Sequence, residues 1–330
     1  MKQTRDSFQR RHPHAALASS GANLSNSTIA DLSHAVGVRT EDFVDATRPT
    51  PPNGGASGSA TRTMPTTVWY PAAGPASQPV TPDAPPDAAD GPYPLVVFAH
   101  GFATVPNTYV ELLSRWASAG YVVVAPAIPL LNSDAPGGAS HDDYGPANIA
   151  DLGFAIEEAL GRAATATDPA FALFALVDRT KVAVAGHSDG EVLAYALAFE
   201  SCCHDPHVEA AVLLAGNLDN ARALPAPTGV PVLHVMADLD EYNAYSKAIE
   251  FDRAHLVAPS YSLTLRSAHH APPFEDPGDP HFDLVARVSV DFLDMALKGA
   301  AGGPMRLASD VDAAQDLATL EARSGSPAGP

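Results

Sequence analysis

A serine flanked by glycines is the residue of this chain best suited to chemistry. The run from Gly186 to Gly190 reads Gly-His-Ser-Asp-Gly, between an apolar segment at 181–185 and a helix-like segment at 191–200. In such a strand–turn–helix context a serine lies on a sharp turn with its hydroxyl exposed at the carboxyl end of the strand. The flanking glycines let the strand and helix backbones pass close to the turn. The pattern predicts that Ser188 is a nucleophile.

A loop after a later predicted strand supplies three carboxylates. A serine hydroxyl attacks efficiently only when a histidine accepts its proton and a carboxylate orients that histidine. In this architecture the acid, and then the histidine, follow the serine along the chain. The predicted strand 232–236 is followed by Asp238, Asp240 and Glu241. We favour Asp240 as the orienting acid, with Asp238 as the alternative.

Two adjacent histidines follow the next predicted strand, at 262–265. They are His269 and His270, and either one is a candidate for the base. The chain has 13 histidines, and acidic loops are common on protein surfaces, so neither loop is specific alone. Serine, acid and histidine in this order, each after a predicted strand, form a much more specific combination.

The turn His100–Phe102 follows the apolar run 95–99 and is a fourth part of the pattern. Gly101 allows the backbone N–H groups of this turn to point inward. We expect the N–H groups of Phe102 and of Asp189, the residue after the serine, to form an oxyanion hole. We expect His100 to orient its neighbours rather than to act as a base.

The alternation of strand and helix patterns predicts the fold class. Apolar runs typical of strands buried on both faces alternate with helical patterns from residue 95 to residue 298. This order predicts an α/β protein with a doubly wound, mostly parallel sheet and helices on both faces. Too few residues separate the predicted strands 210–214 and 232–236 for a large cap domain. We therefore expect an open site, covered by loops such as 129–146.

Composition limits the partners and the location. The chain has 330 residues, 46% of them hydrophobic, and a formal net charge of −19. So acidic a chain repels phosphate backbones, so we expect no nucleic-acid partner. No segment approaches the roughly 20 apolar residues of a membrane span, and the first residues lack the apolar core of an export signal. We expect a cytoplasmic protein, or a secreted one if a signal has been lost or the start is misassigned.

Three segments divide the chain. Residues 1–38 are rich in Ser, Ala and Asn and are expected to form a flexible N-terminal arm. Residues 39–300 carry all the candidate site residues and form the predicted catalytic domain. Residues 301–330 are expected to be a C-terminal extension that is partly disordered.

Two further groups of residues are candidates for metal or redox chemistry. Cys202 and Cys203 are adjacent and cannot close a loop, so we expect a surface pair and no ordinary disulfide staple. His141, Asp142 and Asp143 lie in the predicted covering loop and are expected to be solvated. We predict no metal site.

Four segments together resemble the α/β-hydrolase superfamily: Trp69–Ala72, Leu95–Phe102, Gly186–Gly190 and His270–Phe274. More narrowly they look like the bacterial branch near platelet-activating-factor acetylhydrolase, chlorophyllase and the polyester-hydrolysing cutinases. The resemblance covers roughly residues 40–300. It implies the α/β-hydrolase fold, a Ser-His-Asp triad, and serine esterase chemistry on a small-molecule ester without a metal or organic cofactor.

The resemblance also bears on the choice of histidine. Branches with His-x-Pro-Pro-aromatic imply His270, whereas the cutinase pattern Ser-His-x-Ala-Pro implies His269. We favour His270 because the run 272–274 matches the first pattern without a gap. Glu191 is a departure, because many relatives carry a second glycine there. Asp189 also differs from the methionine or leucine common in lipolytic members, and it is expected to disfavour anionic substrates.

The leading functional interpretation is a carboxylic ester hydrolase of the carboxylesterase type that works through an acyl-enzyme. Related acyl hydrolases are the alternative: a thioesterase, a lactonase of the dienelactone type, or an amidase. Dienelactone-type enzymes usually carry a cysteine where this chain has Ser188. An interpretation of another class is a non-catalytic binding protein with a hydrolase fold, and the intact set of serine, acid and histidine argues against it.

Overall fold

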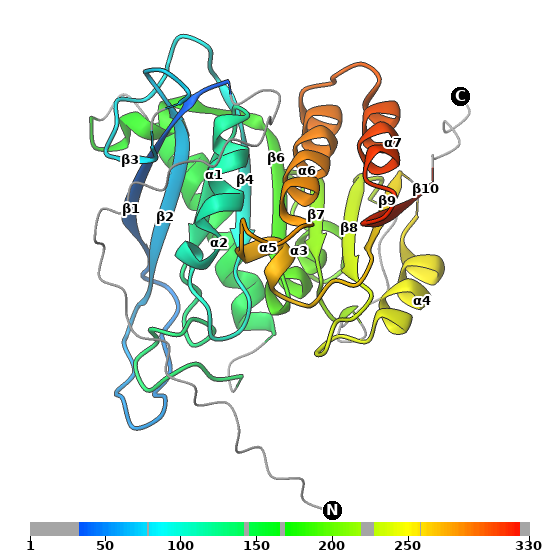
Figure 1. Ribbon diagram of the computed structural model, residues 1–330. Helices are drawn as coiled ribbons and strands as arrows, with labels where there is room; N and C mark the ends of the chain where they lie inside the picture. Colours follow the sequence, from blue (N-terminus) through cyan, green and yellow to red (C-terminus); the bar gives the residue numbers. More distant parts are fainter. Residues whose placement is uncertain are drawn as a thin grey trace, which may run out of the picture.

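A ten-stranded sheet forms the centre of the molecule (Figure 1). The structure is a computed structural model and describes residues 33–77, 79–141, 145–165, 169–218, 228–257 and 259–323. The order of the strands is β10-β9-β8-β7-β6-β4-β5-β2-β1-β3. Their bounds are β1 (Ala35–Asp45), β2 (Arg62–Ala72), β3 (Thr81–Pro82), β4 (Tyr93–Ala99), β5 (Val122–Pro126), β6 (Val177–His187), β7 (Val208–Leu214), β8 (Val232–Ala237), β9 (Ser260–Leu265) and β10 (Ala318–Arg323).

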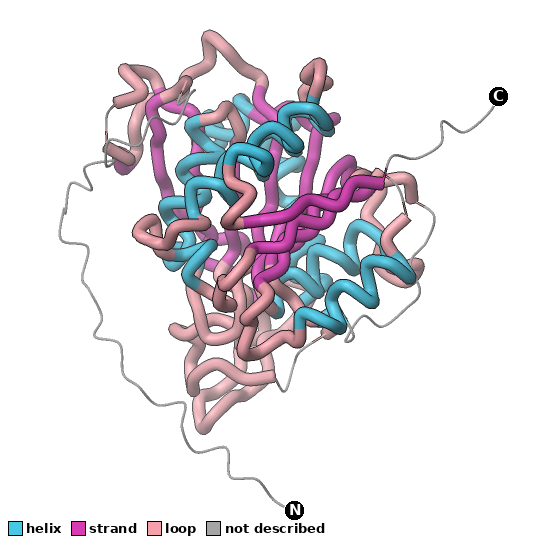
Figure 2. Tube along the Cα trace, turned by 45° about the vertical axis from the view of Figure 1, so that its right-hand side comes forward, coloured by secondary structure: helices cyan, strands magenta, loops and turns pink. Residues whose placement is uncertain are grey.

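The middle of the sheet is parallel and its margins are mostly antiparallel. Strands β5, β4, β6, β7, β8 and β9 pair in parallel, whereas β2 pairs antiparallel with both β5 and β1, and β10 pairs antiparallel with β9. The sheet twists strongly, so that the strands at its two ends run in different directions (Figure 2). All the parallel strands end at the same edge, where the loops with the candidate residues begin.

Helices cover both faces of the sheet. Alternate residues of β4 belong to different cores: Leu95 and Val97 pack in one and Val96 and Phe98 in the other, and all four are fully buried. Helices α2 and α3 contribute to the first core, and α1, α6 and α7 to the second. The helices are η1 (Pro106–Tyr109), α1 (Val110–Ser118), α2 (Pro146–Ala164), η2 (Pro169–Leu176), α3 (Asp189–Phe199), α4 (Tyr245–His255), α5 (Pro272–Glu275), α6 (Phe282–Leu297) and α7 (Gly303–Ala313).

This arrangement confirms the predicted fold class. The sheet is mostly parallel and is covered on both faces, as expected for a doubly wound protein. Strand β7 ends at Leu214 and β8 begins at Val232, which leaves no room for a large cap domain between them. No helix of the described ranges is both long enough and apolar enough to cross a membrane.

The sheet extends past both boundaries that the sequence suggested for the domain. Strand β1 begins at Ala35, inside the predicted arm, and residues 1–32 of that arm lie outside the described residues. Within the predicted extension, α7 packs on α6 and β10 pairs with β9. Both strands lie near an edge of the sheet and carry polar residues that face solvent. They therefore lack the continuous apolar run by which the inner strands were predicted.

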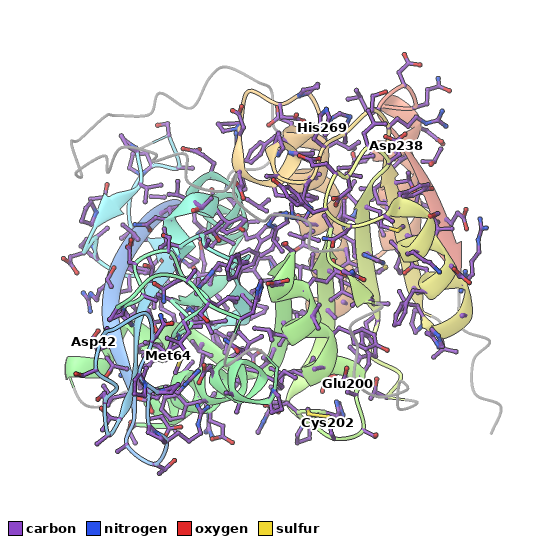
Figure 3. The ribbon with its side chains drawn as sticks, turned by 90° about the horizontal axis from the view of Figure 1, so that it is seen from below. Asp42, Met64, Glu200, Cys202, Asp238 and His269 are labelled. Carbon is purple, nitrogen blue, oxygen red and sulfur yellow. A yellow bond between two sulfur atoms is a disulfide. The ribbon has the colours of Figure 1, made fainter. Side chains whose placement is uncertain are left out.

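The two cysteines differ from the expectation of a simple surface pair. Cys202 and Cys203 lie in the turn after α3 and are joined by a disulfide, drawn in yellow in Figure 3. Because the bonded residues are neighbours, the bond closes no loop of the chain.

Candidate active site

Ser188 lies on the sharp turn between β6 and α3. Its backbone has φ of 57° and ψ of −123°, a conformation that costs a non-glycine residue energy. Close packing imposes this turn. A Cβ on Gly186 would lie 2.1 Å from the carbonyl oxygen of Gly190, and a Cβ on Gly190 would lie 2.1 Å from that of Ala99. Only glycine fits at both positions, as the sequence pattern predicted.

The structure brings Ser188, His270 and Asp240 together in one hydrogen-bonded chain. The Nε2 atom of His270 lies 2.9 Å from the Oγ of Ser188, and its Nδ1 lies 2.7 Å from Oδ2 of Asp240. Asp240 follows β8 and His270 follows β9, so both reach the serine from the carboxyl ends of neighbouring parallel strands. The side chains of Asp240 and His270 are only 3% and 8% exposed. The arrangement can take a proton from the serine hydroxyl and stabilise the resulting imidazolium.

Asp240 is held as a carboxylate. Its Oδ1 accepts the backbone N–H groups of Tyr242 at 2.8 Å and Asn243 at 2.7 Å. Burial raises the pKa of Asp240, but the hydrogen bonds from His270, Asn243 and Tyr242 outweigh burial and hold the pKa below its usual range. An ionised Asp240 keeps the proton of His270 on Nδ1, which leaves Nε2 free to accept the proton of the serine.

The two alternatives from the sequence lie differently. The side chain of His269 is 61% exposed, and its Nδ1 faces Oε2 of Glu241 at 3.4 Å. The backbone N–H of Asp238 donates to the carbonyl of Leu265 at the end of β9. No hydrogen bond joins Asp238 to either histidine in the described part of the chain. Figure 3 labels both residues; their loops are neighbours, since the N–H of Leu239 donates to the carbonyl of Ala268.

The Gly101 turn passes directly beside the serine. A Cβ on Gly101 would lie 3.2 Å from the Cβ of Ser188. The next residue but one, Ala103, donates its N–H to the carbonyl of Leu131, which fixes the turn from outside. Among the described residues, neither the N–H of Phe102 nor that of Asp189 donates to a backbone acceptor. Phe102 follows Gly101 in this turn and Asp189 follows the serine, and these are the two positions from which the sequence led us to expect oxyanion-hole donors.

His100 is fully buried, and both of its ring nitrogens make hydrogen bonds. Its Nδ1–H donates to the carbonyl of Gly101 at 2.8 Å, and its Nε2 accepts the N–H of Ile128 at 3.0 Å. Burial lowers the pKa of His100 to about 4, against a smaller opposing effect of the bond to Gly101. The neutral imidazole therefore joins the turn to the chain after β5.

A buried network that the sequence did not predict connects the turn, the serine and the histidine loop. Tyr109 accepts the N–H of Gly101 at 3.1 Å and donates its hydroxyl to Nδ1 of His187 at 2.8 Å. The Nε2–H of His187 donates to the carbonyl of His270 at 3.0 Å. Burial, followed by the neighbouring His270, lowers the pKa of His187 to about 3. These hydrogen bonds join the Gly101 turn to the loop of His270 through two buried side chains.

Glu275 adds a titratable group to this network. Its Oε1 lies 4.0 Å from Nδ1 of His187, and its side chain is 25% exposed. Burial raises the pKa of Glu275 to about 7, although His270 and Tyr109 oppose the shift. The group therefore changes charge in the neutral pH range.

The covering loop contacts both residues whose N–H groups flank the serine. The ring of His141 stacks on that of Phe102 with centroids 3.9 Å apart, and its Nε2 lies 2.7 Å from Oδ2 of Asp189. His141 is thus engaged with the site, where the sequence led us to expect a solvated loop. Asp142 and Asp143 lie outside the described residues.

Two clusters offer three ligand atoms to a metal ion in the part of the chain that the structure describes. They are Glu200 with Cys202 and Cys203, and His34 with Asp87 and Asp90. The two sulfur atoms of the first cluster are bonded to each other and are not thiolates. In the second, Nδ1 of His34 already faces Asp87 at 3.3 Å. We assign no metal to either cluster.

The fold and the order of these residues define the class of protein. A mostly parallel sheet with a serine on a strand–helix turn, followed by the acid and the histidine after later strands, is the arrangement of the α/β-hydrolases. The model of the chlorophyllase family matches residues 70–215, which include the Gly101 turn and Ser188 but end before Asp240 and His270.

A solved structure has a similar fold. A ferulic acid esterase from Streptomyces cinnamoneus superposes with a TM-score of 0.57 and 22% sequence identity, over 81% of this chain and 91% of that chain. No curated protein matches the chain. The solved structure shows that this chain shares the fold of that protein, and the family match covers the part of the chain with the serine turn.

Proposed function

We propose that this protein is a serine-dependent carboxylic ester hydrolase that works through an acyl-enzyme. The hydrogen-bonded chain from Ser188 through His270 to Asp240 carries the proposal, because it contains a nucleophile, a base and an orienting acid in contact. The match to the chlorophyllase family and the ferulic acid esterase with a similar fold support an ester as the substrate.

The proposed reaction has two halves. The hydroxyl proton of Ser188 passes to Nε2 of His270 as the serine oxygen attacks the ester carbonyl. The N–H groups of Phe102 and Asp189 stabilise the oxyanion, and Asp240 stabilises the imidazolium. The imidazolium then gives its proton to the leaving alcohol, and the acyl group stays on the serine. In the second half, water loses a proton to His270, attacks the acyl-enzyme and releases the acid, and the serine recovers its proton.

Charge at the site favours neutral substrates. Asp189 is next to the nucleophile, and its side chain is 24% exposed. The whole chain has a net charge of −19, which also repels anionic esters. We therefore propose uncharged acyl and alcohol groups.

A panel of neutral esters with graded acyl length, including a feruloyl ester, tests the proposal with S188A as the control. Turnover by the parent and none by S188A is the expected result, together with labelling of the parent by a fluorophosphonate. Thioesters, lactones and amides in the same panel test the related acyl hydrolases. A parent protein that is neither labelled nor active would point to the non-catalytic binding protein.

A further inference from the structure

Three buried ionisable side chains meet beneath the serine turn. They are Glu191 on α3, His234 on β8 and Asp252 on α4, and each is at most 1% exposed. The Nε2 atom of His234 lies 3.2 Å from Oε1 of Glu191, and its Nδ1 lies 2.6 Å from Oδ1 of Asp252. None of the three takes part in the proposed reaction. Charged groups so deeply buried persist only when they are paired, so this ion trio requires a structural or functional reason.

The surroundings of His234 favour the cationic form of its imidazole. Burial lowers the pKa of His234, but Asp252 and Glu191 outweigh burial and raise the pKa well above its usual value. The Nδ1 atom makes a hydrogen bond to Asp252, whereas the 3.2 Å contact of Nε2 with Glu191 lacks hydrogen-bond geometry and is a contact between charges. The second oxygen of Asp252 accepts the hydroxyl of Ser262 at 2.5 Å. The fourth oxygen of the two carboxylates, Oε2 of Glu191, faces away from His234 toward the end of β7.

That oxygen accepts the backbone N–H of Gly216 at 2.6 Å, just after the end of β7. Two parts of the candidate site are attached to the same short segment. The N–H of Ser188 donates to the carbonyl of Leu214 at 2.9 Å. The side-chain amide of Asn243 donates to the carbonyl of Ala215 at 2.7 Å.

Asn243 in turn donates its backbone N–H to Oδ1 of Asp240 at 2.7 Å. The segment 214–216 therefore contacts the serine turn on one side and the acid loop on the other, and Glu191 fixes its end. A displacement of about 1 Å between a nucleophile and its base can lower a rate about a hundredfold.

We propose that Glu191 is a positioning residue for the esterase reaction, and that the His234 cation locks its carboxylate onto Gly216. This inference rests on the proposed function. A residue without a side chain at position 191 could not join Gly216 to His234. Asp252 completes the ion trio by holding the far side of the imidazolium.

Three variants test the positioning role. E191A removes the acceptor of Gly216, and E191Q keeps an acceptor oxygen without the charge. D151N is the matched control. Asp151 lies on α2 and is another fully buried carboxylate, whose Oδ1 lies 2.6 Å from Nε of Arg62. We expect kcat to fall about 30- to 100-fold in E191A with KM within about threefold, and to return to within about fivefold of the parent in E191Q. D151N should lower Tm while kcat stays within about twofold.

A kcat within twofold of the parent in E191A would overturn the positioning role, as would equal losses in E191Q and E191A. Equal kcat losses in E191A and D151N would show general destabilisation instead. NMR of the parent protein needs no variant to fold: two ring N–H signals from His234 at pH 8 are expected, and a neutral ring would overturn the ion trio. Failure of the proposed function is recognised separately, by a parent that turns over no ester in the panel with S188A.

Discussion

Replacing Glu275 by glutamine should stabilise the protein at neutral and alkaline pH but not at acid pH. In the folded protein the pKa of Glu275 is raised from 4.5 to about 7, because the carboxyl is buried beside His187. The folded state therefore binds the proton of Glu275 more tightly than the unfolded chain does. Below pH 4.5 this carboxyl is protonated in both states and does not lower the free energy of unfolding. As the pH rises from 4.5 to about 7, it lowers the free energy of unfolding more and more.

The size of the effect follows from the two pKa values. Each unit between the folded and unfolded pKa corresponds to about 1.4 kcal/mol, so the 4.5 to about 7 shift means that ionised Glu275 destabilises the folded state by at most about 3.5 kcal/mol. Partial exposure of the side chain, 25%, reduces this value toward about 1–2 kcal/mol. A glutamine has the shape of the protonated carboxyl and stays neutral, so E275Q should raise Tm at pH 8 by about 2–6 °C.

Thermal unfolding of the parent and E275Q at pH 4, 6 and 8 measures the effect. The control is E250Q, because Glu250 is 71% exposed and pairs with Lys247 at the surface. The Tm difference between E250Q and the parent should hardly depend on pH. The reasoning about Glu275 is refuted if E275Q gains the same Tm at pH 4 as at pH 8. It is also refuted if E275Q is less stable than the parent at pH 8.

Three further predictions concern the site and its support. D240N should lower kcat by about 10⁴, because an amide stabilises the wrong tautomer of the histidine, whereas D238N should have a much smaller effect; kinetics on one short-chain ester rank the two. H270A should be nearly inactive in the same assay and H269A should keep substantial activity, and the opposite result would assign the base to His269. The raised pKa of His234 stabilises the folded state below the unfolded pKa, and this stabilisation is lost as the pH rises through the folded pKa. Denaturant titrations should therefore show stability that starts to fall as the pH rises above the unfolded value of 6.5 and stops falling once the folded pKa is passed.

The positions of the serine and its partners could be predicted because they depend on local signals and on chain order. The turn at Ser188 needs glycines at fixed spacing, and parallel strands that end at one edge bring their following loops together. The choice between Asp240 and Asp238 depends on the path of a single loop. There the N–H of Leu239 donates to the carbonyl of Ala268, a contact between loops that no local pattern specifies.

The supporting networks could not be predicted, because each combines residues from elements far apart in the chain. Tyr109 and His187 are 78 residues apart, and Glu191 and Gly216 are 25 apart. A weaker signal was present nonetheless. His234 interrupts an apolar strand, where a buried polar side chain needs a partner. The identity of that partner depends on tertiary packing.

The first turn of α3 carries carboxylates with two separate tasks. Asp189 and Glu191 are two residues apart, so a helix of 3.6 residues per turn directs their side chains to nearly opposite sides. Asp189 faces the covering loop, where its carboxylate meets His141. Glu191 faces the interior, where its carboxylate holds Gly216. Substitutions at Asp189 should therefore act on which substrates bind, whereas substitutions at Glu191 should act on how well the bound substrate reacts. The first turn of α3 therefore offers two carboxylates whose proposed roles can be tested separately by substitution.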